Sequence, residues 1–255
     1  MRIALLTQDD PFYLAEAIAE FTELVKENDI EFVTAIVSSA SPFGKRESFL
    51  DKALKTYNIF GLVFFLRYTF NFILRKFILR KSVIKELENR RIPVWQLRDS
   101  INIEKNVAKI AKMNLDAIII IAGNQIIKSD VLGLPKFGVI NAHSSLLPKH
   151  KGLMPTFWAL KNRDDVTGVT VFFLTEGIDD GPIINQGKIK INQDTTQQDL
   201  IIESKEMANK LLIDALNSLK NGTVDRKPNI GDDSYNRFPT REDVDCFLKQ
   251  GNKFF

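Results

Sequence analysis

Cysteine is almost absent from this chain of 255 residues, and long apolar runs are absent altogether. The single cysteine, Cys246, can form neither an intrachain disulfide nor a cysteine-based metal site, so a reducing cytoplasm is the expected compartment. The apolar stretch that precedes Asp9 and Asp10 is too short for a signal peptide. No apolar run approaches the roughly 20 residues that a membrane-spanning helix needs.

A large excess of either charge is also missing. The net charge is only +3, whereas proteins that bind nucleic acid by neutralising phosphates carry a stronger basic excess. We therefore expect no nucleic-acid partner, and we predict no metal site. The composition, with 44% hydrophobic and 26% charged residues, is ordinary for a globular protein.

Strands and helices alternate through most of the chain. The apolar patterns predict strands at 3–6, 31–38, 93–97, 116–122 and 138–141, and helices at 12–27, 104–113 and near 129. Such alternation implies right-handed crossovers and a doubly wound, mostly parallel sheet of the α/β class. Residues 118–121 are four consecutive isoleucines, as in a central strand that is covered on both faces.

The second half of the chain predicts an antiparallel addition to this sheet. Residues 166–174 and 183–191 are rich in β-branched side chains and are joined by a turn-forming loop at 177–182. A long helix is predicted over 196–220 and ends at Asn221-Gly222. We expect residues 1–222 to form one domain and the polar residues 223–255 to form a short arm packed on it.

Residues 59–81 form an unusual segment that is both apolar and basic. Aromatic and aliphatic residues are interrupted by Arg67 and are followed by Arg75, Lys76, Arg80 and Lys81. One interpretation is a helical insertion that lies on an anionic membrane surface, which would make the protein peripheral to the inner face of a membrane. The other is a helix pair packed on the sheet or on a second subunit, as in a homodimer.

Residues suited to catalysis gather between 141 and 186. Asn141 ends a predicted parallel strand, where open α/β sheets bind their ligands, and His143 lies on the loop that follows. Asp179 lies in the 177–182 loop. An amide that donates to an oxyanion, an imidazole that relays a proton and a carboxylate that fixes the imidazole suit acyl transfer to an amine. Each residue alone also suits a structural role in a turn.

The order of the motifs is more specific than any one residue. The chain contains Asn141-Ala142-His143, Ser145-Leu146-Leu147-Pro148, Thr167-Gly168-Val169-Thr170 and Asp179-Asp180-Gly181-Pro182-Ile183-Ile184. On these motifs it resembles the formyltransferases that use 10-formyltetrahydrofolate, strongly over about 116–191. The resemblance implies a Rossmann-like formyltransferase fold, a catalytic domain over residues 1–222, and catalytic roles for Asn141, His143 and Asp179.

The resemblance also implies that backbone groups of two loops hold the folate cosubstrate, without a metal. The loop residues would be Ile121, Ala122, Gly123, Asn124 and Gln125 in one loop, and Leu174, Glu176, Gly177 and Ile178 in the other. Many relatives have an arginine before the glycine that follows Ser-Leu-Leu-Pro. This chain has Lys151 there, which keeps the charge and loses the bidentate fork of arginine.

Comparison with members of this family narrows the range of amines that could accept the formyl group. Residues 7–12 lack the glycine-rich phosphate loop of glycinamide ribonucleotide enzymes, and the residues after 220 are too few for the β-barrel of methionyl-tRNA enzymes. We therefore expect a small-molecule amine, namely an amino sugar carried on a nucleotide. The alternatives are hydrolysis of 10-formyltetrahydrofolate, a membrane-borne or lipid-linked amine, and a catalytically silent binding scaffold.

Overall fold

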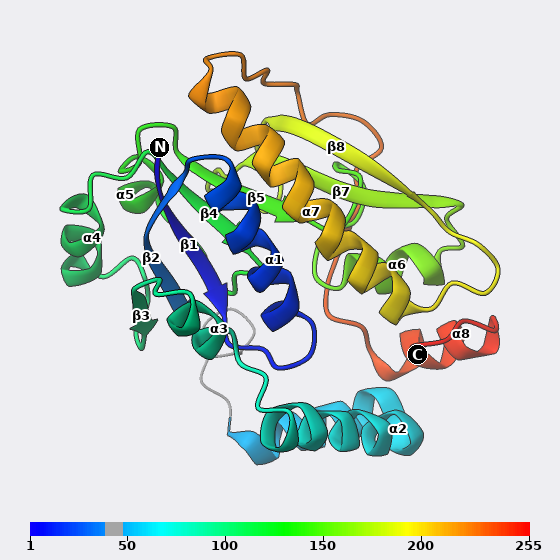
Figure 1. Ribbon diagram of the computed structural model, residues 1–255. Helices are drawn as coiled ribbons and strands as arrows, with labels where there is room; N and C mark the ends of the chain where they lie inside the picture. Colours follow the sequence, from blue (N-terminus) through cyan, green and yellow to red (C-terminus); the bar gives the residue numbers. More distant parts are fainter. Residues whose placement is uncertain (39–47) are drawn as a thin grey trace.

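The computed structural model of the protein describes residues 1–38 and 48–255, and its centre is a seven-stranded sheet (Figure 1). The strand order is β3-β2-β1-β4-β5-β7-β8. The strands are β1 (Arg2–Gln8), β2 (Glu31–Ser38), β3 (Val94–Leu97), β4 (Ala117–Ile121), β5 (Val139–His143), β7 (Val166–Phe173) and β8 (Ile183–Lys190). The first five pair in parallel, while β7 is antiparallel to both β5 and β8. The predicted doubly wound sheet with an antiparallel addition is confirmed.

Helices cover both faces of this sheet (Figure 1). On one face, α1 (Leu14–Glu27), α3 (Val83–Asn89) and α7 (Gln197–Lys220) bury Ile3 and Leu5 of β1. On the other face, α4 (Glu104–Ala111) and α5 (Ser129–Leu132) bury Ala4 and Leu6. Strand β4 lies between these layers and is buried at every position, which is why all its residues are apolar.

Helix α7 begins where its sequence supplies a cap. The Thr196 hydroxyl accepts the backbone N–H of Asp199, and the Asp199 carboxylate accepts the backbone N–H of Thr196 in return. This capping box satisfies backbone donors that the first turn leaves free, and the hydrogen bonds from Thr196 lower the pKa of Asp199. The helix reaches Lys220 and ends at the predicted Asn221-Gly222.

The apolar and basic segment forms α2 (Phe49–Ile73) and the π-helical turn η2 (Leu74–Ile78). Gly61 has a φ of 83°, so α2 is two helical halves joined at a kink. Both halves lie along the lower edge of the molecule, away from the sheet and beside α8 (Arg241–Lys249) (Figure 1). Among the residues that the structure describes, no helix is long and apolar enough to cross a membrane.

Residues 223–255 run back across the molecule and contact it in several places, beginning with a bridge between Lys227 and Ile183. The short strand β9 (Tyr235–Asn236) pairs in parallel with β6 (Lys151–Gly152). Phe247 of α8 and Phe254 stack in an apolar cluster with Phe157 of α6 (Pro155–Lys161). Trp158 and Leu160 of α6 are buried in the same cluster. The division into a domain of residues 1–222 and an arm stays a prediction.

Candidate active site

Strand β5 carries Asn141 and His143 to the carboxyl end of the sheet. Residues two apart on a strand share a face. Val139 packs on the side of α4 and α5, whereas Ile140 packs under α1 and α7, so Asn141 and His143 lie on the α4–α5 side. His143 was expected on the loop, and this was wrong: β5 extends to His143 because this residue pairs with Thr170 of β7.

Both ring nitrogens of the buried His143 face oxygen atoms. Nε2 lies 2.8 Å from the carbonyl oxygen of His150, and because a carbonyl can only accept, Nε2 carries a proton and donates it. Nδ1 lies 3.6 Å from Oδ2 of Asp179, which is longer than a hydrogen bond. Nδ1 is therefore the nitrogen that can exchange a proton with a substrate, next to a carboxylate that can stabilise the resulting cation.

The position of Asp179 is fixed by hydrogen bonds from the backbone of Gly152 and the side chain of Asn229. Its Oδ2 accepts the N–H of Gly152 at 2.8 Å, and its carbonyl oxygen accepts from the Asn229 side chain at 3.0 Å. The same Asn229 amide lies 3.1 Å from the carbonyl oxygen of Gly181. A Cβ at Gly181 would collide with the Phe173 carbonyl, so the Asp-x-Gly motif needs its glycine to fold the loop this tightly.

Asn141 completes the group with an unused amide. Its side chain is half-buried and has no hydrogen-bond partner within residues 1–38 and 48–255. Since it shares a face of β5 with His143, its N–H group is free to donate to a ligand beside the imidazole. An amide donor, a proton-exchanging nitrogen and a carboxylate thus converge at one edge of the sheet.

A second layer of residues holds this site together, and the sequence reading did not single it out. His150 is buried, and its Nε2 lies 2.6 Å from Oδ2 of Asp164. Its Nδ1 accepts from the Asn236 side chain at 2.9 Å, which leaves Nε2 as the donor to Asp164. Because the carbonyl of His150 accepts the hydrogen bond from Nε2–H of His143, this network sets the orientation of the His143 ring. The sequence signal for this layer is a second histidine, His150, which follows His143 by seven residues.

The lysines around His150 are neutralised within the chain. Lys149 Nζ lies 2.7 Å from Oδ1 of Asp164, and Lys151 Nζ lies 2.9 Å from Oδ2 of Asp233. Lys151 is the residue that stands where many relatives have arginine. A Cβ at Gly152 would collide with the carbonyl of Asn236, so the close approach of β9 requires this glycine.

The first predicted folate loop follows β4. The carbonyl of Ile121 accepts from the Thr7 hydroxyl at 2.8 Å, and Ala122 turns the chain with a φ of 53°. Gly123 packs against Ile120, Asn124 accepts from the Ser38 hydroxyl at 2.6 Å, and Gln125 accepts the N–H of Ile101 at 3.2 Å. These contacts shape the loop and leave its role in binding a prediction.

The second predicted folate loop follows β7 and meets the first across α5. The N–H of Leu174 donates to Val139 at 2.8 Å, and Glu176 accepts the N–H of Ser129, the first residue of α5, at 3.1 Å. Gly177 lies against the Asp180 carboxyl group, while the Ile178 side chain is exposed. Both loops therefore border the α4–α5 side on which Asn141 and His143 lie.

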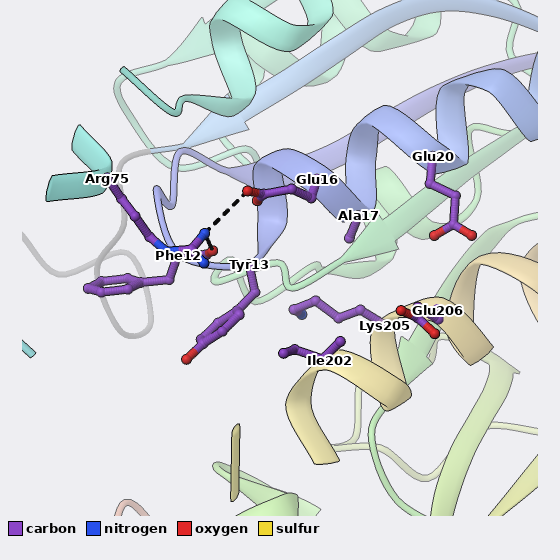
Figure 2. Close-up of a pocket in the computed structure, with 9 residues that line it drawn as sticks. All are labelled: Phe12, Tyr13, Glu16, Ala17, Glu20, Arg75, Ile202, Lys205 and Glu206. Carbon is purple, nitrogen blue, oxygen red and sulfur yellow. Dashed lines mark hydrogen bonds and ion pairs between the residues drawn. The ribbon is translucent and has the colours of Figure 1, made fainter. Parts of the chain in front are cut away.

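A cavity of about 220 Å³ opens on the other side of the sheet, between α1, α7 and η2 (Figure 2). Phe12 and Tyr13, at the carboxyl end of β1, form one wall. Four charged residues from the three helices line the rest: Glu16, Glu20, Arg75 and Lys205, joined by Glu206 at the rim. Burial lowers the pKa of Lys205 and raises that of Tyr13. No pattern in the sequence predicts this cavity.

Comparison with known proteins identifies relatives that match about half of the chain. The chain is 35% identical to the methionyl-tRNA formyltransferase of Thermodesulfovibrio yellowstonii over 129 residues, which cover 51% of this chain and 42% of the relative. The enzyme of the same name from Halothermothrix orenii is 35% identical over 150 residues, covering 58% and 47%. The chain thus spans less than half the length of these relatives.

Solved structures share the fold over nearly the whole chain. A sugar N-formyltransferase from Shewanella sp. matches with a TM-score of 0.63 at 17% identity, covering 98% of this chain and 87% of that one. Glycinamide ribonucleotide transformylase 1 from Symbiobacterium toebii gives 0.62 at 18% identity, covering 91% and 94%. An N-formyltransferase from Helicobacter canadensis in complex with folinic acid and dTDP-3-aminofucose gives 0.58 at 20% identity, covering 95% and 71%.

The family model described as formyl transferase matches residues 75–216, which is more than half of the chain and contains Asn141, His143 and Asp179. The Rossmann-like formyltransferase fold is confirmed by the solved structures. The chain therefore belongs to the formyl transferase family.

Proposed function

We propose that the protein transfers a formyl group from 10-formyltetrahydrofolate to the primary amine of an amino sugar carried on a nucleotide. The observation that carries this proposal is the arrangement of three side chains. The free amide of Asn141 lies on the same face of β5 as His143, whose unprotonated Nδ1 is 3.6 Å from Asp179. These are the groups that formyl transfer to nitrogen requires.

The reaction needs one bond to form, one to break and one proton to move. The amine nitrogen attacks the formyl carbon, and its carbonyl oxygen becomes an oxyanion that the Asn141 amide stabilises. The bond between the formyl carbon and N10 of the folate then breaks. The proton lost by the amine is carried to N10 through Nδ1 of His143, while Asp179 stabilises the transient imidazolium. No covalent enzyme intermediate is needed.

Two features support the folate part of the proposal. The loops at 121–125 and 174–178 border the α4–α5 side of the site and follow the two strands that flank Asn141, whose partners in register are Ile120 and Phe172. The solved relative from Helicobacter canadensis holds folinic acid, a formylated folate, in the same fold. We assign the pterin to these two loops, where backbone donors and acceptors would hold it.

The acceptor part is supported by features around the site. Tyr235 of β9 is 57% exposed and lies against Gly152, next to the Asp179 carboxylate, so its ring is available for a nucleotide base to stack on.

A second acceptor is favoured by a separate observation. The relatives with 35% identity are methionyl-tRNA formyltransferases, so the amino group of an aminoacyl-tRNA is the alternative. The net charge of +3 gives little attraction for a polyanion, which is why we place the amino sugar first.

The deciding experiment offers labelled 10-formyltetrahydrofolate with a panel of nucleotide-linked amino sugars and, separately, with methionyl-tRNA. The expected result is a product that has gained one carbonyl group by mass spectrometry, formed with an amino sugar and absent when Asn141→Ala protein is used. Transfer to methionyl-tRNA alone would assign the second acceptor. Release of labelled formate at the same rate without any amine would identify a hydrolase and reject the proposal.

A further inference from the structure

The segment 48–81 presents two apolar faces, and the described residues 1–38 and 82–255 cover only one of them. Phe60, Phe64, Tyr68 and Phe72 recur every four residues and form the inner face of α2. Their rings contact other parts of the chain: Phe60 and Phe64 meet Phe254, and Tyr68 and Phe72 meet Phe12. Burial raises the pKa of Tyr68, in agreement with its position on the covered face.

The opposite face of the same segment is exposed. We call it the α2–η2 face and define it by its large apolar side chains, of which Val63 is 83% exposed and Phe70 is 67% exposed. Its members are Leu62, Val63, Leu66, Phe70, Phe77 and Ile78. Single exposed apolar residues are common on protein surfaces, but six large ones within residues 62–78 indicate an interaction surface.

The charge of the chain is concentrated in the same segment. Residues 48–81 contain seven lysines and arginines and one acid, Asp51, which is a net charge of 7 − 1 = +6. The remaining residues contain 35 − 7 = 28 basic and 32 − 1 = 31 acidic side chains, a net charge of −3. Two of the cations, Arg75 and Lys81, share the single carboxylate of Glu16, so the segment stays positive.

This combination selects among the surfaces that could cover the α2–η2 face. A symmetric dimer would bring the segment 48–81 of two copies together, and each segment carries a net charge of +6, so like charges would oppose association. An anionic bilayer instead attracts the cations and buries the aromatic and aliphatic side chains at the boundary between headgroups and acyl chains. It does not need a complementary shape.

We infer that the α2–η2 face docks the protein on the surface of an anionic lipid bilayer. The segment lies in the plane of the surface, with Val63, Phe70 and Phe77 inserted and the exposed Lys76 and Arg80 at the headgroups. This inference does not depend on formyl transfer, because it rests on the exposure and charge of residues 48–81 alone.

The test is flotation of the full chain with vesicles of two compositions. One is phosphatidylcholine alone, and the other contains about one third phosphatidylglycerol, which supplies the negative surface. The intact protein should bind the anionic vesicles, should bind the neutral ones at least about tenfold more weakly, and should be released by salt.

Two double variants separate the α2–η2 face from general effects. Val63→Asp with Phe70→Asp adds two negative charges to the face, and Ile230→Asp with Leu248→Asp adds the same two charges at exposed apolar residues elsewhere. The first pair should weaken binding to anionic vesicles at least about tenfold, and the second should leave it within about twofold. Far-ultraviolet circular dichroism and melting curves check that both variants are folded.

Three results would overturn the inference. They are no binding of the intact protein to anionic vesicles, equal loss of binding in both variants, and a stable dimer in sedimentation equilibrium that Val63→Asp with Phe70→Asp disrupts while vesicle binding is absent. The last result would assign the face to a second copy of the chain.

Discussion

The role proposed for Asp179 can be tested by replacing its carboxylate with an amide of the same shape. Asp179→Asn keeps an oxygen that can accept the N–H of Gly152, so the loop should hold its position. The change removes the negative charge 3.6 Å from Nδ1 of His143. This charge matters only after the imidazole has taken a proton, which occurs between the attack of the amine and the departure of the folate.

The size of the effect follows from the geometry. Two unit charges 3.6 Å apart attract each other by about 4–5 kcal/mol at an effective dielectric constant of about 20, and both side chains are mostly buried, with 9% and 13% exposure. A tenfold change in rate corresponds to about 1.4 kcal/mol. Part of the attraction is replaced by the amide dipole, so we expect kcat to fall roughly a hundredfold to a thousandfold.

The assay compares steady-state turnover with the affinity for a formylated folate that does not react. Asp179→Asn and His143→Ala should each lower kcat by at least about a hundredfold while the Kd of the folate stays within a few fold, because both groups act in the transition state. Asp180→Asn is the matched control, since this neighbouring carboxylate accepts from Thr175 and not from His143. Turnover of Asp179→Asn close to that of Asp180→Asn would refute the assignment, as would a loss of folate affinity equal to the loss of kcat.

Three further changes test other parts of the structure. His150→Asn removes ring hydrogen bonds to Asp164 and Asn236 from a buried position, so the free energy of unfolding in urea should fall by about 1–3 kcal/mol, and an unchanged unfolding midpoint would contradict the network. Asn229→Ala removes the donor to the carbonyls of Asp179 and Gly181, so kcat should fall by about tenfold while the melting temperature changes little; Asn221→Ala, at the exposed end of α7, is the control. Burial lowers the pKa of Lys205 in the folded chain from its ordinary value of 10.5. Between the lowered pKa and 10.5, the unfolded chain therefore binds more protons at this residue than the folded chain does. In this pH range the contribution of Lys205 to the free energy of unfolding rises with pH. Lys205→Met should therefore be more stable than the wild type at neutral pH, and urea unfolding should show this advantage shrinking as the pH approaches 10.5; an advantage that grows with pH would show the sign to be wrong.

The sheet could be predicted from the sequence because its strands carry local patterns. The isoleucines of β4 are apolar at every position since helices cover both faces, and the β-branched runs of β7 and β8 are joined by a short loop. The start of α2 was missed because the apolar pattern becomes continuous only near Ile59. The capping box of Ser48 and Asp51 marks that start in the sequence.

The outer layer of the site could not be predicted in the same way. Asn141, His143 and Asp179 were predicted together because their motifs stand in a recognisable order within one stretch. The partners of His150 have no such order: Asp164 is 14 residues away and Asn236 is 86 residues away. Contacts between such distant positions follow no helical or strand period, so only the folded chain reveals them.

The way that residues 223–255 reach the site has a consequence for protein synthesis. Asn229 and Asn236 hold the loops of Asp179 and His150 from 50 and 86 residues further along the chain. A nascent chain that has left the ribosome as far as α7 already contains all seven strands of the sheet, yet it lacks the donors that set the imidazole and the carboxylate. A chain that ends before Asn229 should therefore form the sheet but hold the His143 ring and the Asp179 carboxylate less firmly than the full chain does.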